Sequence, residues 1–442
     1  MEHFGHSRAS RALPLIACVL AFAPQAGASQ GEAKPVSEAE SDAQVGAVRA
    51  FEEFGPRVVK IEVIERGSRT KNSLGTGFFI DDRGQLVTNY HVVSEAIRKP
   101  HLYHLEYVVD GESRPAKVLA VDVVHDLAIV GVEDRETEGF ALTDARPAQG
   151  SKVYSLGHPH DLGLTIVEGT YNGLLEHRLY EQLHFSGAIN AGMSGGPALL
   201  DDGRVVGVNV ATMGNEVGFL VPIRFAVALQ ARLRRDGPTP PEELNARITQ
   251  QVLDHQREAF GSLDPAEGTQ STLGPFSVPG RIAPFLRCWA SHDDDEHKLY
   301  TRQSQQCGTQ ARIYIDDELY AGSITFRHVY FRSKDLGALR FARLIENQFG
   351  STWSIDAGAR ASHTEFRCEE ANVATDWGPP MRSLLCLRAY RHYAGLYDLV
   401  VKLATVDRTD QGMVSTMVAE GVSYETSMSL GKRFLESIKW AP

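Results

Sequence analysis

The chain alternates short apolar runs with clusters of glycine, aspartate and proline from about residue 58 to residue 221. Short runs of apolar and β-branched residues bounded by such turn residues are typical of β-strands. Many strands of this kind favour an all-β barrel architecture. The expected strands are 58–64, 77–80, 86–92, 104–109, 117–121 and 127–132, then, after a break at Arg146-Pro147, 152–156, 164–171, 182–189, 197–200, 205–210 and 218–221.

Two helices are expected to bracket this strand-rich region. One is predicted over Val45–Phe54, ahead of Gly55-Pro56. The other is predicted over Ile223–Arg235, where the apolar spacing is helical and basic residues gather late. The pattern therefore predicts one folded domain over residues 45–235.

Residues 236–442 do not continue the pattern of short strands. The run GPTPP at 237–241 opens an expected linker over 236–283, with a helix over Glu242–Phe260 and a mobile segment over Gly261–Pro279, which is rich in Gly, Ser, Thr and Pro. Residues 284–442 are predicted to form an α+β domain of unknown role. Its expected strands are Ala311–Ile315, Ser323–Phe331 and Leu396–Leu403, and its expected helices are Leu336–Gln348, Gly412–Glu420 and Ser429–Ile438.

The first 28 residues match a secretory signal peptide. Arg8 and Arg11 are basic, residues 12–23 are apolar, and AGA at 26–28 is a small-residue cleavage site. The apolar stretch is too short to span a bilayer. Cleavage after Ala28 is predicted, followed by a flexible polar lead-in over 29–44. A lipoprotein cleavage box ending at Cys18 is the alternative, which is disfavoured because the apolar run continues past that cysteine. The expected location is periplasmic or secreted.

The charge balance narrows the classes of partner. The chain has 45 lysines and arginines against 56 aspartates and glutamates, a net charge of −11. Such an acidic balance argues against nucleic acid and against charge-driven binding to anionic membranes. No later segment reads as a transmembrane span. The expected partners are protein or peptide substrates, and the sequence does not reveal an oligomeric state.

Cysteine usage points to an oxidising compartment. Apart from Cys18, the cysteines are Cys288, Cys307, Cys368 and Cys386, all in the last third of the chain. Four cysteines allow three connectivities. The sequential pairing, first with second and third with fourth, closes the shortest loops and is favoured. A zinc site is the alternative, but no Cys-x-x-Cys spacing supports it.

Neither a metal nor a cofactor is expected. The run HDDDEH at 292–297 could bind a cation, but carboxylates this dense in sequence repel one another, so a solvated loop is favoured. The run HPH at 158–160 is interpreted as a turn.

Three short motifs carry candidate chemistry. The run GMSGGP at 192–197 surrounds Ser194 with glycines, which let backbone amides turn toward one point. A serine becomes a useful nucleophile when a base takes its proton and fixed N–H groups stabilise the developing charge. Upstream, TNYHVV at 88–93 places His91 at the expected end of a strand, and DLA at 126–128 places Asp126 before another. Asp122 is the competing acid, and the neighbouring His125 is interpreted as a bystander.

Together, these motifs resemble the signatures of trypsin-like serine proteases, most closely the HtrA/Deg branch of the bacterial envelope. The flanks GAIN at 187–190, GVN at 207–209 and GFLVPI at 218–223 strengthen the resemblance, which covers roughly residues 45–235, about half of the chain. It implies two six-stranded barrels, with His91 and Asp126 on the first and Ser194 on the second. No PDZ domain is recognisable in residues 284–442, because no short Gly-hydrophobic-Gly loop occurs there.

The resemblance also implies a role for each residue. Ser194 would be the nucleophile, His91 the general base and then acid, and Asp126 the group that orients His91. The N–H groups of Gly192 and Ser194 would form the oxyanion hole.

Two departures from the family pattern affect the serine loop. Met193 stands where the families usually have Asn or Asp, and Ala191 where the HtrA branch often has proline. Both changes predict a less firmly set loop. The alternative function is therefore a weak or inactive protease-fold protein that acts as a binding or chaperone-like module.

The same resemblance places the primary specificity pocket. It would be lined by Ala188, Ile189 and Asn190 before the serine loop, and by Val208, Asn209 and Val210 after it. Neither stretch contains Asp or Glu, so small or medium apolar side chains are expected in preference to Lys or Arg. Asn190 and Asn209 have a second interpretation as structural hydrogen bonders.

Overall fold

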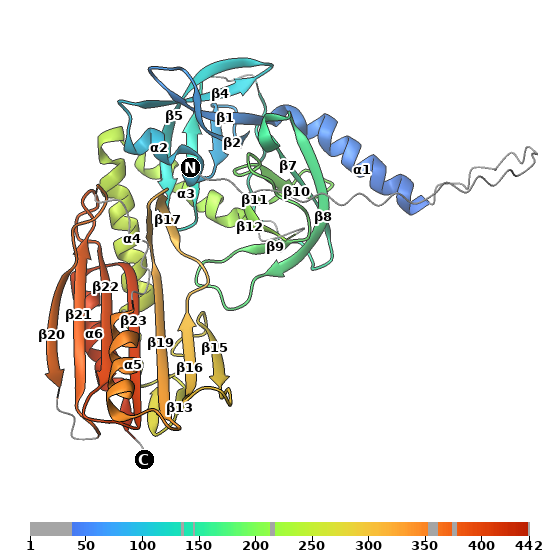
Figure 1. Ribbon diagram of the computed structural model, residues 1–442. Helices are drawn as coiled ribbons and strands as arrows, with labels where there is room; N and C mark the ends of the chain where they lie inside the picture. Colours follow the sequence, from blue (N-terminus) through green and yellow to red (C-terminus); the bar gives the residue numbers. More distant parts are fainter. Residues whose placement is uncertain are drawn as a thin grey trace, which may run out of the picture. The chain divides into compact units, whose positions relative to one another are not determined.

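Two closed antiparallel barrels of six strands each form the first half of the protein (Figure 1). This confirms the predicted barrel architecture. The strand order is β1-β2-β3-β6-β5-β4 in the first barrel and β10-β11-β12-β9-β8-β7 in the second. The strands are β1 (Val58–Glu65), β2 (Lys71–Phe79), β3 (Gln85–Thr88), β4 (Tyr103–Val109), β5 (Glu112–Asp122), β6 (Leu127–Gly131), β7 (Lys152–Gly157), β8 (Thr165–Leu174), β9 (Leu183–Phe185), β10 (Pro197–Leu199), β11 (Val205–Thr212) and β12 (Gly218–Pro222).

The computed structural model describes residues 38–133, 137–144, 146–212, 217–351, 361–373 and 378–440. Residues 44–442 form one compact unit, and residues 1–43 form a second unit. The expected signal peptide and the start of the lead-in lie outside the described residues. Helix α1 (Glu38–Phe54) begins inside the segment that was expected to be a flexible lead-in.

The segment that carries His91 is a helix, which corrects the predicted strand 86–92. Strand β3 ends at Thr88, and helix α2 (Tyr90–Arg98) follows with Asn89 as its N-cap residue in extended conformation. The apolar side chains after Asn89 recur at helical spacing, so Tyr90, Val93 and Ile97 are all buried on one side. His91 therefore lies in the first turn of a helix and is not at the end of a strand.

The segment that follows the barrels is ordered, and the predicted mobile stretch over Gly261–Pro279 is wrong. After α3 (Ile223–Asp236) and α4 (Leu244–Phe260) come β13 (Gln270–Leu273) and β14 (Phe276–Pro279). Strand β14 pairs with β24 (Lys439–Trp440) near the end of the chain. Phe276 and Val278 are fully buried. Because Phe276 and Val278 are two residues apart in a strand, both side chains point toward the core. The surrounding Gly, Ser, Thr and Pro obscured this signal.

The C-terminal half is an antiparallel sheet of seven strands in the order β15-β16-β19-β23-β22-β21-β20. Helices α5 and α6 cover opposite faces, because Val414 packs in the cluster with α5 while its neighbour Met413 packs in the cluster with α6. The α+β prediction is thereby confirmed. The elements are β15 (Arg287–Asp293), β16 (Tyr300–Gly308), β19 (Ser323–Ser333), α5 (Ala338–Gly350), β20 (Arg367–Val373), β21 (Met381–Ala389), β22 (Tyr397–Thr405), β23 (Gln411–Val422) and α6 (Tyr424–Ser437).

The predicted helix over Gly412–Glu420 is wrong, since these residues lie in the central strand β23. Both faces of the strand are covered, so nearly every residue of it is buried. An apolar run without alternation does not distinguish a buried strand from a buried helix by its periodicity.

Two disulfides join the cysteines in the sequential pairing that was favoured. Cys288–Cys307 links β15 to β16, and Cys368–Cys386 links β20 to β21. In both cases the cysteines are directly opposed in the strand register. Each bridge fastens an edge strand to its neighbour and contributes about 3 kcal/mol of stability through the short loop that it closes.

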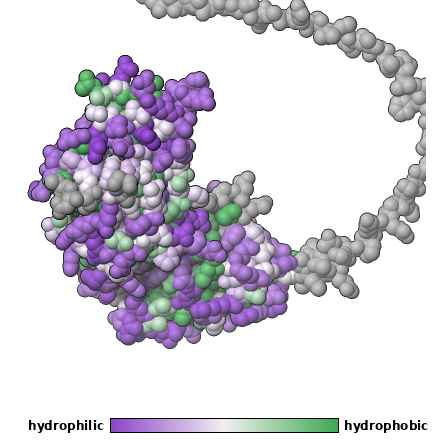
Figure 2. Space-filling view, turned by 90° about the horizontal axis from the view of Figure 1, so that it is seen from below, coloured by the Kyte–Doolittle hydropathy of each residue, from purple (hydrophilic) through white to green (hydrophobic). Residues whose placement is uncertain are grey.

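The C-terminal half and the first barrel share one hydrophobic core. A small hairpin, β17 (Ile313–Asp316) and β18 (Leu319–Ala321), contributes buried side chains to the same cluster as β1, α2 and α4. Strand β17 lies against α2 (Figure 1). The face in Figure 2 is mostly hydrophilic, with small apolar areas between polar ones. Because its apolar side chains belong to the shared cluster, the hairpin buries its apolar surface against the barrel.

Candidate active site

Asp126 holds His91 through two hydrogen bonds. The Nδ1 atom of His91 lies 2.6 Å from Oδ2 of Asp126, and the backbone N–H of His91 donates to Oδ1 at 2.8 Å. An ionised carboxylate only accepts hydrogen bonds, so Nδ1 carries the proton and Nε2 is left free to act as a base. The Asp126 carbonyl accepts a bond from the Asn89 side chain at 2.8 Å, which ties the turn before β6 to the start of α2.

The competing acid, Asp122, has a different partner. Both of its carboxylate oxygens lie 3.0 Å from Nδ1 of His125. The ring of Phe225 stacks on His125 with centroids 3.6 Å apart. Asp122 and His125 therefore form a separate pair, and Asp126 is the carboxylate that contacts His91.

Charge around the imidazole favours its protonated form. Burial alone lowers the pKa of His91, but the charge and hydrogen bond of Asp126, together with the charge of Asp317, outweigh that effect and raise it. A raised pKa suits a group that must hold a proton between two steps of a reaction.

The serine loop packs against the first barrel beside the start of α2. The backbone carbonyl of Ser194 accepts the N–H of Thr76 at 2.8 Å. Gly195 has a positive φ of 87°, and a Cβ there would lie 2.2 Å from the Thr76 carbonyl oxygen and 2.9 Å from the Asn89 nitrogen. Only glycine allows this close approach, which brings the loop next to the residues that precede His91.

The Ser194 hydroxyl bonds to a backbone carbonyl in this structure. Its Oγ donates to the carbonyl of Val210 at 3.4 Å, and within the described residues no hydrogen bond joins it to His91. Rotation about the Cα–Cβ bond of Ser194 would release this long, weak bond.

The amides of Gly192 and Ser194 are left free to bind an anion. Among the described residues, neither N–H has a hydrogen-bond partner. The carbonyl of Ala191 accepts the N–H of His160 at 2.9 Å, and that of Met193 accepts the N–H of Gly196 at 3.0 Å. In a trans peptide the C=O and the N–H of the next residue point in opposite directions. Each of these two amides therefore points away from the group that holds the carbonyl of its own peptide. Two free amides on the serine loop are the kind of donor that an oxyanion hole needs.

Met193 anchors the serine loop by apolar packing. Its side chain is fully buried in the apolar cluster of the second barrel, with Val206 and Leu220 among its neighbours. Its carbonyl also accepts a bond from the Asn209 side chain at 3.2 Å. Apolar packing replaces the polar anchor that the family pattern usually provides.

Only part of the expected specificity pocket keeps exposed surface. Ala188, Asn190 and Val210 are partly or fully exposed. Ile189 and Val208 are buried in hydrophobic clusters. The Asn209 amide is also fully buried and bonds to Ser155, Leu156 and Met193, which agrees with its second interpretation as a structural hydrogen bonder.

Sequence reasoning missed Thr76 as a contributor to the site. Its Oγ1 donates to the carbonyl of Gly192 at 2.7 Å and accepts the N–H of His158 at 3.0 Å. Thr76 thus joins the serine loop to the turn at 158–160, which folds as a short 3-10 helix, Pro159–Asp161. The Gly-Thr-Gly run at 75–77 was a local signal for a close backbone approach.

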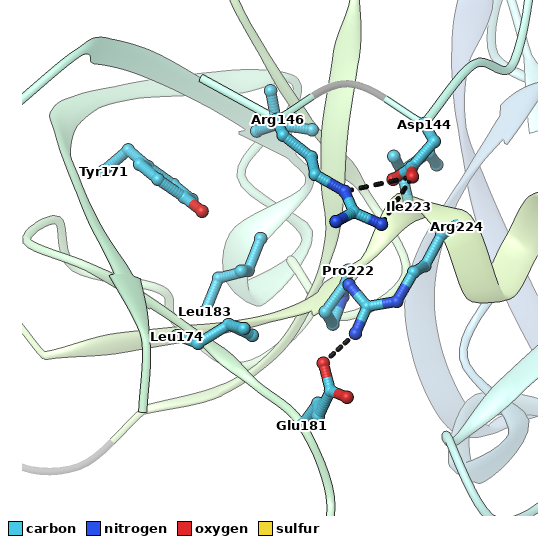
Figure 3. A pocket seen from close by; sticks show the side chains of 10 residues that line it. Asp144, Arg146, Tyr171, Leu174, Glu181, Leu183, Pro222, Ile223 and Arg224 are labelled. Atoms are coloured by element: carbon cyan, nitrogen blue, oxygen red, sulfur yellow. Dashed lines mark hydrogen bonds and ion pairs between the residues drawn. The ribbon is translucent and has the colours of Figure 1, made fainter. Parts of the chain in front are cut away.

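A separate cavity of about 360 Å³ lies at one end of the second barrel (Figure 3). Arg146 pairs with Asp144 at 2.7 Å, and Arg224 pairs with Glu181. None of the three candidate catalytic residues lines the cavity. Because each arginine already has an acidic partner, the cavity presents no uncompensated charge to a ligand.

The acidic run at 292–297 is engaged with lysines. Asp293 pairs with Lys298 at 2.5 Å, and Asp294 pairs with Lys334 at 2.6 Å. The part of the chain that the structure describes contains no group of three or more His, Cys, Asp or Glu arranged to hold a metal ion. None of its helices has the length and apolar character needed to cross a membrane.

Comparisons with known proteins agree with this geometry. Residues 75–208 match the family described as trypsin-like peptidase domain. A probable periplasmic serine endoprotease of the DegP-like kind from Rhizobium meliloti is 31% identical over 254 residues, which cover 53% of this chain and 49% of that protein. A DegP-like relative from Chlamydia muridarum is 29% identical over 209 residues, which cover 45% and 41%.

These two DegP-like relatives match about half of the chain. The chain spans about half the length of the curated relatives that it matches. Among solved structures, a serine endoprotease from Yersinia pestis is 23% identical, with a TM-score of 0.39 over 47% of this chain and 70% of that one. Residues 75–208 thus match a trypsin-like peptidase domain, and the double-barrel half of this chain is similar to DegP-like serine endoproteases.

Proposed function

We propose that the protein is a serine endopeptidase that cleaves peptide bonds through an acyl-enzyme. The His91–Asp126 hydrogen bond beside the serine loop is the observation that carries this proposal. Ser194 Oγ attacks the peptide carbonyl carbon as its proton passes to Nε2 of His91. The oxygen that becomes negative binds the free amides of Gly192 and Ser194. His91 then gives its proton to the leaving amine, and water hydrolyses the ester in the same manner.

The class of substrate is inferred from the exposed residues of the expected specificity pocket and from the descriptions of the relatives. Ala188 and Val210 are apolar and keep exposed surface, so a small or medium apolar side chain is the preferred residue on the acyl side of the bond. Relatives described as periplasmic support an exported enzyme that acts on proteins of the bacterial envelope. Residues 1–28 are then the signal peptide, removed after Ala28.

The first prediction concerns the nucleophile. The purified protein is expected to degrade unfolded casein and to be labelled by a serine-reactive phosphonate, whereas Ser194→Ala does neither. Loss of the nucleophile lowers the rate on the order of 10⁴-fold or more. Ser186→Ala, an exposed serine of the same barrel, is the matched control and keeps full activity. A folded parent protein that neither cleaves nor labels would instead support the binding or chaperone-like alternative.

The second prediction concerns the turn that holds the oxyanion hole. Asp161 accepts hydrogen bonds from Lys60 and Lys71, each at 2.6 Å, and these bonds lower its pKa to about 2. The neighbouring His160 N–H holds the Ala191 carbonyl. Asp161→Asn is expected to weaken the hydrogen bond from the His160 N–H to the Ala191 carbonyl. Because an oxyanion hole acts mainly on the transition state, kcat should fall about 10-fold while KM changes little.

The control for this change is Asp144→Asn, which breaks another exposed ion pair outside the site. The charged form of Asp161 is favoured by folding, so its stabilising effect is present above the ordinary carboxyl pKa and is lost as the pH falls toward 2. Equal kcat values for the two variants at pH 7 would show that the tie does not support the loop.

A further inference from the structure

The hairpin β17–β18 is fastened to the helix that carries His91. Ile313 and Ile315 are buried in one cluster with α2. The Tyr90 hydroxyl donates to the Ile315 carbonyl at 2.8 Å, and Arg98 pairs with the buried Asp316 at 3.3 Å. These contacts lie near the two ends of α2. The helix is therefore held along its length by a segment more than a hundred residues away in the sequence.

One residue of this hairpin faces the imidazole directly. The ring of Tyr314 meets that of His91 edge to face, with centroids 6.0 Å apart and planes at 75°. The Tyr314 hydroxyl lies 3.4 Å from Ser94 Oγ and donates to Asp317 Oδ1 at 2.7 Å. Ser94 in turn donates to the His91 carbonyl at 3.1 Å. Tyr314 is thus held on one side by the turn of its own hairpin and on the other by α2.

We propose that this hairpin belongs to the active site, with Tyr314 as a positioning residue for His91 and Asp317 as the group that orients Tyr314. The proposal rests on the proposed function. Asp126 fixes the imidazole at Nδ1, but a single hydrogen bond leaves the ring free to tilt about that bond. The edge-to-face contact with the Tyr314 ring limits this tilt, because such a contact has a preferred geometry.

This arrangement implies that the C-terminal half helps to position the candidate base, His91. A histidine that must transfer protons needs its Nε2 within hydrogen-bond reach of the serine, and small misplacements cost large factors in rate. The barrel half contributes the residues that react, and the C-terminal half contributes a wall that keeps one of them in place. We therefore expect the residues after 283 to be required for full activity even against small peptide substrates.

Asp317 also acts on His91 through its charge. Among the described residues, the charges that act on the imidazole are those of Asp126 before β6 and Asp317 in the hairpin turn, and the titratable Tyr314 contacts its ring. A negative charge favours the imidazolium, so Asp317 contributes to the raised pKa of His91. Neutralising Asp317 should move this pKa downward, an effect that packing alone would not produce.

The third prediction tests both roles in the full-length protein. The His91 pKa is measured by NMR titration in Ser194→Ala, with and without Asp317→Asn, and it is expected to be lower with Asp317→Asn. The control is Asp335→Asn, an exposed carboxylate of the same half of the chain. This readout needs no activity, so it distinguishes failure of this inference from failure of the proposed function.

Kinetics with a peptide substrate provide the second readout. Tyr314→Ala is expected to lower kcat about 10-fold or more with little change in KM, and Tyr314→Phe should restore most of the loss because it keeps the ring. Tyr424→Ala, an exposed tyrosine on α6, is the matched control. If Tyr314→Ala fails to fold, Tyr314→Phe with Asp317→Asn replaces it and should still show the lowered pKa. An unchanged His91 pKa, or equal kcat values for Tyr314→Ala and Tyr424→Ala, overturns the proposal.

Discussion

Asp126→Asn is expected to lower kcat about 10⁴-fold while the fold is retained. The carboxylate accepts the Nδ1 proton of His91 at 2.6 Å and the His91 backbone N–H at 2.8 Å. An asparagine amide can still occupy this position, but its NH2 group donates toward Nδ1. The imidazole then carries its proton on Nε2, where a proton acceptor for Ser194 is needed.

The two neighbouring aspartates make this test sharp. Asp122→Asn removes a buried charge that pairs with His125 at 3.0 Å, and it is expected to change kcat by less than about 10-fold. Both variants are compared with the parent by steady-state kinetics and by thermal unfolding. A greater loss of kcat in Asp122→Asn than in Asp126→Asn would contradict the assigned roles of the two aspartates.

The C-terminal sheet is expected to lose about 3 kcal/mol of stability between pH 7 and pH 4 through one histidine. His328 of β19 is fully buried, and its Nδ1 lies 2.8 Å from Ser415 Oγ. Burial lowers the pKa of His328 from its ordinary 6.5 to about 3. Below pH 6.5 the unfolded chain therefore binds a proton that the folded chain excludes, so the free energy of unfolding falls as the pH falls.

Urea unfolding at pH 7 and pH 4 measures this effect. His328→Gln removes the titrating group, so its free energy of unfolding should depend less on pH, by about 3 kcal/mol over this range. His297→Gln, which changes an exposed histidine, should keep the pH dependence of the parent. The expectation fails if His328→Gln and the parent lose equal stability on acidification.

The barrels were predictable because their strands carry local signals. Apolar runs such as 58–64 and 205–210 are short, rich in valine and bounded by turn residues, and the structure places strands at both. The two failures in the C-terminal part of the chain have different causes. Gly412–Glu420 is covered on both faces, and Phe276 lies among residues that usually form loops.

The candidate site was likewise predictable only in part. The motifs around Ser194 and His91 were recognisable, because close backbone approaches restrict the residues that can occupy those positions. The sequence already favoured Asp126 over Asp122 through the DLA motif, and the coordinates add that Asp126 contacts His91 whereas Asp122 pairs with His125. Tyr314 had no local signal, because its contact with His91 exists only after distant segments have packed.

The sequence by itself indicated the barrel architecture, favoured the sequential pairing of the cysteines and singled out the candidate nucleophile and base. Each of these depends on residue type and on spacing over a few neighbouring positions. The tertiary structure alone decided that the competing Asp122 pairs with His125, how a buried methionine holds the serine loop, and that the C-terminal hairpin shares a core with the helix bearing the candidate base. These features arise from packing between segments far apart in the chain, which no local pattern encodes.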